Sequence, residues 1–367
     1  MPRDPRYVGR VDVADTDMDE AKALRYLKLA DEASQKLDEP EGNRWADRLE
    51  REHADLQETF EWFTTHRRNA EALRLAADLW TFQFDRGYAD EGRRWLSLAL
   101  EAHEGQNPSA VLATALYGAG MFAFRALDQE RAQRYFEELL EVGRALGDES
   151  SVGRAYGGLS RVALRRGDTR EIRRWSQQGL ELARRRGSEA ETATPLHMFA
   201  EAARVDGNLE EARRFYTENL ELNRRLGREH WIRAETLNLG AIEVLAGNPE
   251  AAVPRLRESL RMTRESTDRF LTPYVLAWTA RVALARHDSA LATRLLAAAQ
   301  AQSERTGLAM DPDEEPEFRK GVAACRSALS AAEFQKNWND GLRIPDEESL
   351  GLAEKLLMAP GSPPGGR

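Results

Sequence analysis

The feature that most constrains this chain is a pattern that repeats every 40 residues. Its clearest column consists of Gly87, Leu127, Gly167, Gly207, Gly247 and His287. The next positions carry Asp or Asn in five cases, at Asp128, Asp168, Asn208, Asn248 and Asp288. Glycine readily takes the left-handed conformation that ends a helix, and an Asx side chain caps the first amides of the next one. The column therefore predicts that one helix ends and another begins once in every period.

Further columns keep the same period and predict how the helices pack. Leucines recur at Leu100, Leu140, Leu180, Leu220 and Leu260, and small residues recur at Gly120, Ser160, Ala200, Gly240 and Ala280. The leucines are expected in the core, and the small residues where neighbouring helices approach closely, since a larger side chain there would cost about 1–3 kcal/mol. A second set of turns falls at Gly147, Gly187, Gly227 and Gly307. Each period is thus predicted to form two amphipathic helices.

Helix pairs of this length occur in several repeat families, and the residue pattern favours one of them. A period of 40 is long for a tetratricopeptide repeat and close to the HEAT and armadillo range. The tetratricopeptide pattern nevertheless appears at Leu239-Gly240, Leu159-Ser160, Ala132 with Phe136, and Ala212 with Tyr216. We predict an all-α fold, a right-handed α-solenoid of tetratricopeptide-like helix pairs with a 40-residue period.

The repeats occupy only part of the chain, which we divide into five parts. We expect disorder at residues 1–19, a helical cap at 20–67, six tetratricopeptide-like repeats at 68–310, a second helical cap at 311–358 and a disordered tail at 359–367. The segment 312–316 begins and ends with proline and breaks the helical pattern between the repeats and the second cap. Caps are expected because a stack of repeats must cover its last apolar faces.

Composition and charge exclude several classes of function. The net charge of −9 argues against a general nucleic-acid binder, and a single cysteine, Cys325, excludes a disulfide framework. The first residues are polar, and no apolar run is long enough to span a bilayer. No phosphate loop, nucleophile–base pair or metal-ligand spacing is present. We therefore expect a cytoplasmic protein with no membrane association, no enzymatic activity, no cofactor and no metal.

The two ends of the helical region resemble a known bacterial family. The resemblance lies in Arg48–Leu56 (RLEREHADL) and in Ala328, Leu329, Phe334, Trp338, Gly341, Glu347, Glu348 and Leu357. These residues are similar to the C-terminal tetratricopeptide region of LuxR-type and SARP-type signal-transduction ATPases, over about residues 20–358. The resemblance implies a region that senses a ligand or partner protein and restrains a regulatory ATPase. Neither the nucleotide-binding loop nor a helix-turn-helix is present, so the chain corresponds to the sensing part alone, as a stand-alone relative or as a fragment.

The resemblance also implies that the first helix of each pair lines a concave groove. The candidate groove residues are Tyr117, Phe124, Arg125, Arg154, Arg161, Arg165, His197 and Arg204. Arginine suits bidentate recognition of carboxylates, and neighbouring aromatic rings add contact area. The favoured partner is therefore a protein or peptide with an acidic segment, and a separate regulatory ATPase is a second candidate. The alternative is that these arginines belong to ordinary solvated helix faces.

Other functions stay open as alternatives. The same groove suits a small-molecule sensor, and a peptide-pheromone receptor is a special case of the favoured hypothesis. The segment 161–186 holds nine arginines and three acidic residues. A nucleic-acid contact there is disfavoured, because no nucleic-acid motif accompanies the charge. We predict a non-catalytic scaffold or sensor module of a bacterial transcription-regulatory or signalling system.

Overall fold

The computed structural model describes residues 18–37, 42–103, 105, 107–265, 270–306, 309–312 and 314–360. The regular structure in these ranges is entirely helical, with eighteen α-helices and one 3-10 helix. The expected disordered ends, 1–19 and 359–367, lie outside these ranges except for residues 18, 19, 359 and 360. The turn predicted at Gly307 also lies outside them.

The helices follow one another along a right-handed α-solenoid of tetratricopeptide-like pairs, as predicted. Three helices come first, namely α1 (Glu20–Ser34), α2 (Gly42–Arg51) and α3 (His53–Thr65). Six pairs follow: α4 (Asn69–Arg86) and α5 (Ala89–Glu101); α6 (Ala110–Arg125) and α7 (Gln129–Leu146); α8 (Glu149–Arg165) and α9 (Thr169–Arg185); α10 (Ala193–Val205) and α11 (Leu209–Leu226); α12 (Glu229–Leu245) and α13 (Pro249–Glu265); α14 (Thr272–Ala285) and α15 (Ser289–Thr306). The short 3-10 helix η1 (Ala190–Thr192) precedes α10, and the last helices are α16 (Glu314–Ala328), α17 (Ala331–Arg343) and α18 (Asp346–Met358).

The turn column that defines the period has the geometry predicted for it. All six of its residues have a positive φ, including Leu127 at 63° and His287 at 64°. Four of the five Asx residues accept a hydrogen bond from the backbone N–H three residues later, at Asp128, Asp168, Asn208 and Asp288. Left-handed turns and side-chain caps therefore join the helices even where the glycine is replaced.

Small residues allow neighbouring helices to pack closely against large aromatic rings. The ring of Phe136 on α7 lies against Gly120 on α6 and Gly158 on α8. A Cβ atom would lie 2.5 Å from this ring at Gly120 and 2.3 Å at Gly158, which is too close for any side chain. The small-residue column thus marks close packing, as the period predicted.

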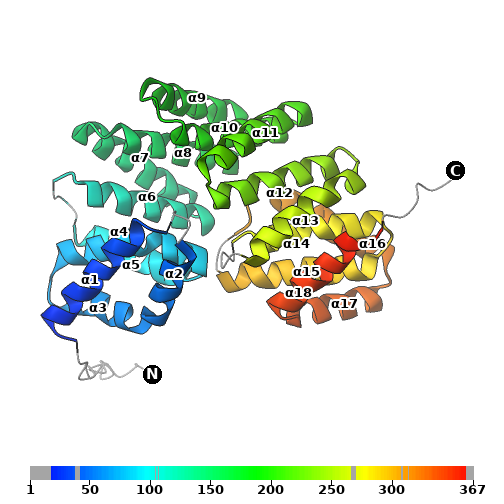
Figure 1. Ribbon diagram of the computed structural model, residues 1–367, viewed down its shortest axis with the longest axis horizontal. Helices are drawn as coiled ribbons and strands as arrows, with labels where there is room; N and C mark the ends of the chain where they lie inside the picture. Colours follow the sequence, from blue (N-terminus) through cyan, green and yellow to red (C-terminus); the bar gives the residue numbers. More distant parts are fainter. Residues whose placement is uncertain are drawn as a thin grey trace, which may run out of the picture.

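The solenoid bends into an arch whose two ends approach each other (Figure 1). Helices α1 to α5 form one end and α13 to α18 form the other, while α6 to α12 connect them. The rings of Phe84 and Phe270 meet between the two ends at 5.6 Å. Four described residues between α15 and α16, together with the first residue of α16, form what we call the acidic loop: Ala309, Met310, Asp311, Pro312 and Glu314. This loop contacts α6, α8, α10 and α14, which are all first helices of their pairs.

Candidate binding site on the inner face of the arch

Arg125, the last residue of α6, is held by the acidic loop. Its Nη1 atom lies 2.7 Å from Asp311 Oδ1 and donates to the Tyr274 hydroxyl at 3.0 Å. The Arg125 carbonyl also accepts a hydrogen bond from the Ala309 N–H at 2.9 Å. Burial by itself would lower the pKa of Arg125, but the nearby Asp311 and Tyr274 reverse this and raise it. The guanidinium is therefore a buried charge that the protein itself compensates.

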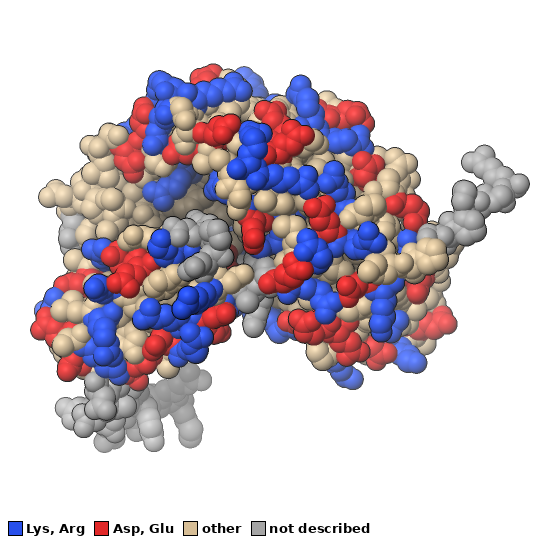
Figure 2. All heavy atoms as spheres, viewed as in Figure 1, with Lys and Arg blue, Asp and Glu red and all other residues tan. Residues whose placement is uncertain are grey.

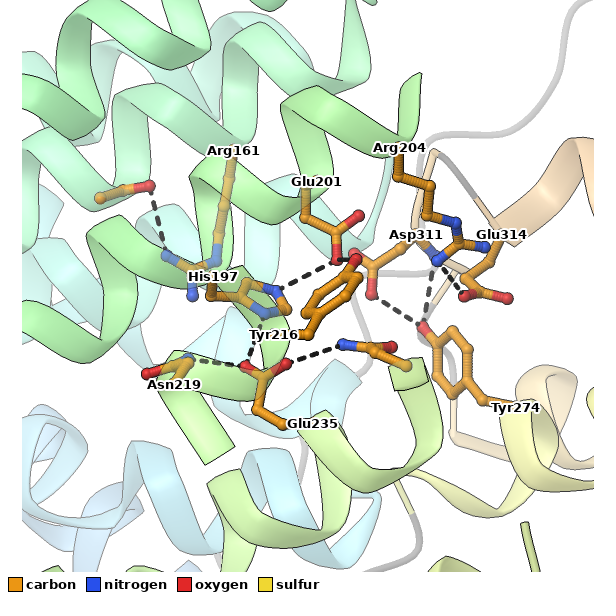
Figure 3. A network of polar contacts seen from close by, with 12 residues as sticks. Arg161, His197, Glu201, Arg204, Tyr216, Asn219, Glu235, Tyr274, Asp311 and Glu314 are labelled. Atoms are coloured by element: carbon orange, nitrogen blue, oxygen red, sulfur yellow. Dashed lines mark hydrogen bonds and ion pairs between the residues drawn. The ribbon is translucent and has the colours of Figure 1, made fainter. Parts of the chain in front are cut away.

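Arg204, near the end of α10, forms a second ion pair with the loop. Its Nη1 atom lies 2.7 Å from Glu314 Oε1, and both side chains are almost fully buried. The other carboxylate oxygen of Glu314 accepts a hydrogen bond from the Trp278 indole at 2.7 Å. Figure 3 shows Arg204, Glu314, Asp311 and Tyr274 together at one side of the site. The loop thus carries two carboxylates three residues apart, each bound by an arginine of the inner face.

Arg165, the last residue of α8, contacts the same loop without a carboxylate. Its Nη1 atom donates to the Met310 carbonyl at 3.3 Å, and its guanidinium lies 4.8 Å from the centre of the Phe124 ring. Burial lowers the pKa of Arg165; the charge of Asp311 opposes this, and the charge of Arg125 adds to it. Arg165 is therefore a half-buried cation with only partial compensation.

Arg154 and Arg161, earlier on α8, form no direct salt bridge among the described residues, although the Ser151 hydroxyl links Arg154 to the Asp148 carboxylate. Arg154 donates to the Ser151 hydroxyl at 2.8 Å and lies over the Tyr117 ring at 5.5 Å. Arg161 donates to the Gly157 carbonyl of its own helix at 3.2 Å. Both side chains are half-exposed, and the buried Nε of Arg154 has no hydrogen-bond partner. These two cations remain able to bind an external carboxylate.

His197 on α10 joins a buried network beside Arg161 (Figure 3). Its Nδ1 atom lies 2.9 Å from Glu235 Oε1, and its Nε2 atom lies 3.5 Å from Glu201 Oε1. Both carboxylates are buried and accept further hydrogen bonds, from Asn219 to Glu235 and from Tyr216 to Glu201. The network ties α10 to α11 and α12, so these carboxylates are already engaged in holding the helices together.

Figure 2 shows the face hollowed at the centre of the arch, with basic side chains along its wall. The inner face of α8 contributes the two arginines without a direct salt bridge, and the acidic loop covers the three compensated or partly compensated ones. The hollow therefore presents positive charge in a chain whose net charge is −9.

The structure brings the eight predicted residues to one face, but they differ in their surroundings. Arg125, Arg165 and Arg204 contact the acidic loop, Phe124 lies buried beneath Arg125 and Arg165, and Tyr117 packs under Arg154. His197 belongs to the buried network. Whether any of them binds a ligand stays a prediction. Sequence reasoning missed Asp311 and Glu314, although the density of acidic residues in 311–317 was a visible signal.

In the arginine-rich segment 161–186, four of the nine arginines form ion pairs, and all four lie on or directly after α9. Arg173 pairs with Asp206 and Glu211, and Arg174 pairs with Glu171. Arg185 and Arg186 pair with Glu149 and Glu191 respectively. These contacts match the ordinary solvated helix that was the alternative to nucleic-acid binding.

Two further properties bear on function. Among the residues that the structure describes, no helix is both long and apolar enough to cross a bilayer. Nor do three or more His, Cys, Asp or Glu side chains in these ranges gather into a group able to hold a metal ion.

Comparison with known proteins agrees with the fold. Residues 111–185 and 191–265 match the family model of the tetratricopeptide repeat, and they span α6 to α13. No curated protein matches the chain. The crystal structure of a Rap protein complexed with competence and sporulation factor is similar over 92% of this chain and 97% of its own, with 12% identity and a TM-score of 0.55. At this identity the likeness shows the fold alone.

Two other solved structures are more distantly similar. The apo form of RapI has 14% identity and a TM-score of 0.46, over 91% of this chain and 97% of its own. BtubC (BKLC) from P. vanneervenii has 16% identity and a TM-score of 0.42, over 66% and 91%. The resemblance to regulatory ATPases stays a prediction.

Proposed function

We propose that this protein is a non-catalytic scaffold that binds an acidic peptide or protein segment on the inner face of the arch. The observation that carries the proposal is the pair Arg154 and Arg161, half-exposed cations that form no direct salt bridge with a carboxylate of the described residues. Arginine binds carboxylates through charge-assisted hydrogen bonds, which are about twice as strong as neutral ones. The repeat fold supports a binding role, and a Rap protein with this fold was crystallised in complex with competence and sporulation factor.

The spacing of the two arginines indicates the form of the ligand. They stand seven residues apart on α8, which is about 10 Å at a rise of 1.5 Å per residue. A peptide in the polyproline II conformation has three residues per turn and advances about 3.1 Å per residue, so carboxylates three residues apart lie on one side and would reach both arginines. The acidic loop uses this same spacing at Asp311 and Glu314.

The biological setting belongs to the same proposal. We place the scaffold in a bacterial regulatory or signalling system, with a separate regulatory ATPase as one candidate partner. This part rests on the resemblance of residues 20–358 to the sensing regions of such ATPases.

The test is a fluorescence anisotropy titration with a labelled Glu-Gly-Gly repeat peptide. The protein is expected to bind it, and not the Gln-Gly-Gly copy. The double variant Arg154→Glu/Arg161→Glu should weaken binding by about a hundredfold, since each lost charged hydrogen bond is worth at least about 1.5 kcal/mol. The matched control Arg170→Glu/Arg184→Glu makes the same charge change at exposed positions of α9 and should bind like the unmodified protein. Equal affinities for the two double variants would refute the proposal.

A further inference from the structure

The acidic loop binds arginines of the inner face through carboxylates, which is how the proposed partner would bind. It presents carboxylates at Asp311 and Glu314, and it binds Arg125 and Arg204 through them. Arg165 receives only the Met310 carbonyl. Three of the five inner-face arginines are therefore occupied by a segment of the chain itself, while Arg154 and Arg161 remain open.

We propose that the acidic loop is an internal pseudo-ligand, which an acidic segment of a partner displaces from Arg125, Arg165 and Arg204. This inference rests on the proposed function and adds its regulation. The partner would first bind Arg154 and Arg161 and then extend along the inner face as the loop leaves.

The contacts of the loop are of a kind that a competing peptide can replace one for one. Residues 309–312 are only half-buried; their polar interactions with the inner face are hydrogen bonds and an ion pair, and Met310 also packs against the apolar core. Glu314 alone is buried, and it is the first residue of α16. Because the first turn of a helix has the fewest backbone hydrogen bonds, Glu314 can leave its site without unfolding the rest of α16.

The loop is part of the same chain as the arginines that it binds, and this determines how strongly it competes with a partner. A segment joined by a short connection acts at a high effective concentration, in the millimolar range for flexible linkers. A partner must compete with that concentration. Its apparent affinity is therefore its intrinsic affinity multiplied by the fraction of molecules in which the loop is released. Weakening one ion pair of the loop should therefore increase the affinity for an acidic peptide.

Displacement would also loosen the arch. Arg125 on α6 is bridged to Tyr274 on α14 by a direct hydrogen bond and through Asp311. These contacts join α6, the first of the connecting helices, to α14 in the far end of the arch. Binding of a partner to the inner face would thereby change how closely α6 and α14 are held together.

Glu314→Gln is the variant that tests the inference, with the Glu-Gly-Gly repeat peptide as probe. It keeps the shape of the side chain and removes its charge from Arg204, and we expect binding to tighten by about tenfold or more. Glu304→Gln is the matched control, because Glu304 is exposed on α15 and accepts a hydrogen bond from Gln300 of its own helix, so this variant should bind like the unmodified protein. Helical content measured by circular dichroism confirms that both variants are folded.

Hydrogen exchange of the unmodified protein provides a second readout that needs no variant. The amides of Ala309 and Asp311 are hydrogen-bonded to the Arg125 carbonyl and the Tyr274 hydroxyl. Saturating peptide should make both exchange faster.

The outcomes separate the inference from the proposed function. If the peptide binds through Arg154 and Arg161 but Glu314→Gln leaves its affinity unchanged and the two amides stay protected, the loop is a fixed part of the fold and the inference is wrong. If neither the unmodified protein nor the variant binds the peptide, the proposed function fails as well.

Discussion

Arg125 and Arg165 occupy the same position of successive repeats, at the last residues of α6 and α8. Their charges nevertheless have different surroundings. Arg125 meets the Asp311 carboxylate, and its pKa is raised. Arg165 meets only the Met310 and Phe124 carbonyls, and its pKa is lowered by burial. The repeat fixes where such a side chain lies, and the acidic loop decides whether its charge is compensated.

The largest expected effect is the difference in stability between two variants, in which one or the other of these arginines is replaced by methionine. Arg125→Met leaves Asp311 without its ion-pair partner, and breaking a buried pair in this way costs about 3 kcal/mol. Arg165→Met removes a cation that has no carboxylate partner, and methionine can fill the space against Phe124, so the expected cost is below about 1 kcal/mol. Urea denaturation of the two variants measures the difference. Equal losses of stability would mean that the loop carboxylate does not distinguish the two positions.

Asp78 on α4 is a carboxyl group whose burial, like that of the Arg165 guanidinium, is only partly compensated by a neighbouring charge. Burial raises its pKa to about 7; the charge of Asp31 adds to the increase, and Arg74 at 3.7 Å only partly opposes it. The folded state therefore keeps a proton that the unfolded chain has lost, and stability should fall as the pH rises from about 4 to about 7. The loss is at most about 1.4 kcal/mol for each pH unit in this window.

Asp78→Asn is the variant that isolates this effect. Its stability should depend less on pH between about 4 and about 7 than that of the unmodified protein. Urea denaturation of both proteins across the window measures the difference, in which the other titrating groups cancel. Parallel pH profiles would show that the Asp78 carboxyl titrates normally.

The turns that follow the two arginines give the smallest expected effect. Leu127 after α6 and Gly167 after α8 are both left-handed, with φ of 63° and 67°. A side chain in this conformation costs roughly 1–2 kcal/mol, and the Leu127 side chain is 55% exposed. Leu127→Gly should therefore stabilise the protein by about 0.5–1 kcal/mol, and Gly167→Ala should destabilise it by about 1 kcal/mol. Thermal melts of both variants check the signs, and a loss of stability in Leu127→Gly would contradict this explanation.

These positions also show what the sequence could predict. The 40-residue column at Leu127, Gly167 and His287 was enough to place the turns, because a left-handed turn and an Asx cap are local structures. The close approach of Phe136 to Gly120 was likewise implied by the small-residue column, whereas Gly158 lies outside that column. Local geometry and the period therefore determined the fold class, while the domain boundaries stay predictions.

The site depends on contacts that a repeat period does not encode. Arg204 and Glu314 are separated by 110 residues, and they meet because the curvature of every pair adds up to an arch. A small change in that curvature would move the acidic loop away from α6 and α10. The arginines could therefore be assigned to one face, but the segment that covers three of them could not be foreseen.

One titration series tests most directly whether the inner-face arginines bind carboxylates. It compares the affinity of the Glu-Gly-Gly repeat peptide for four proteins: the unmodified chain, Arg154→Glu/Arg161→Glu, Arg170→Glu/Arg184→Glu and Glu314→Gln. We predict that Glu314→Gln binds most tightly, that the unmodified chain and the α9 variant bind equally, and that the α8 variant binds most weakly. Equal affinities for all four folded proteins would contradict the account.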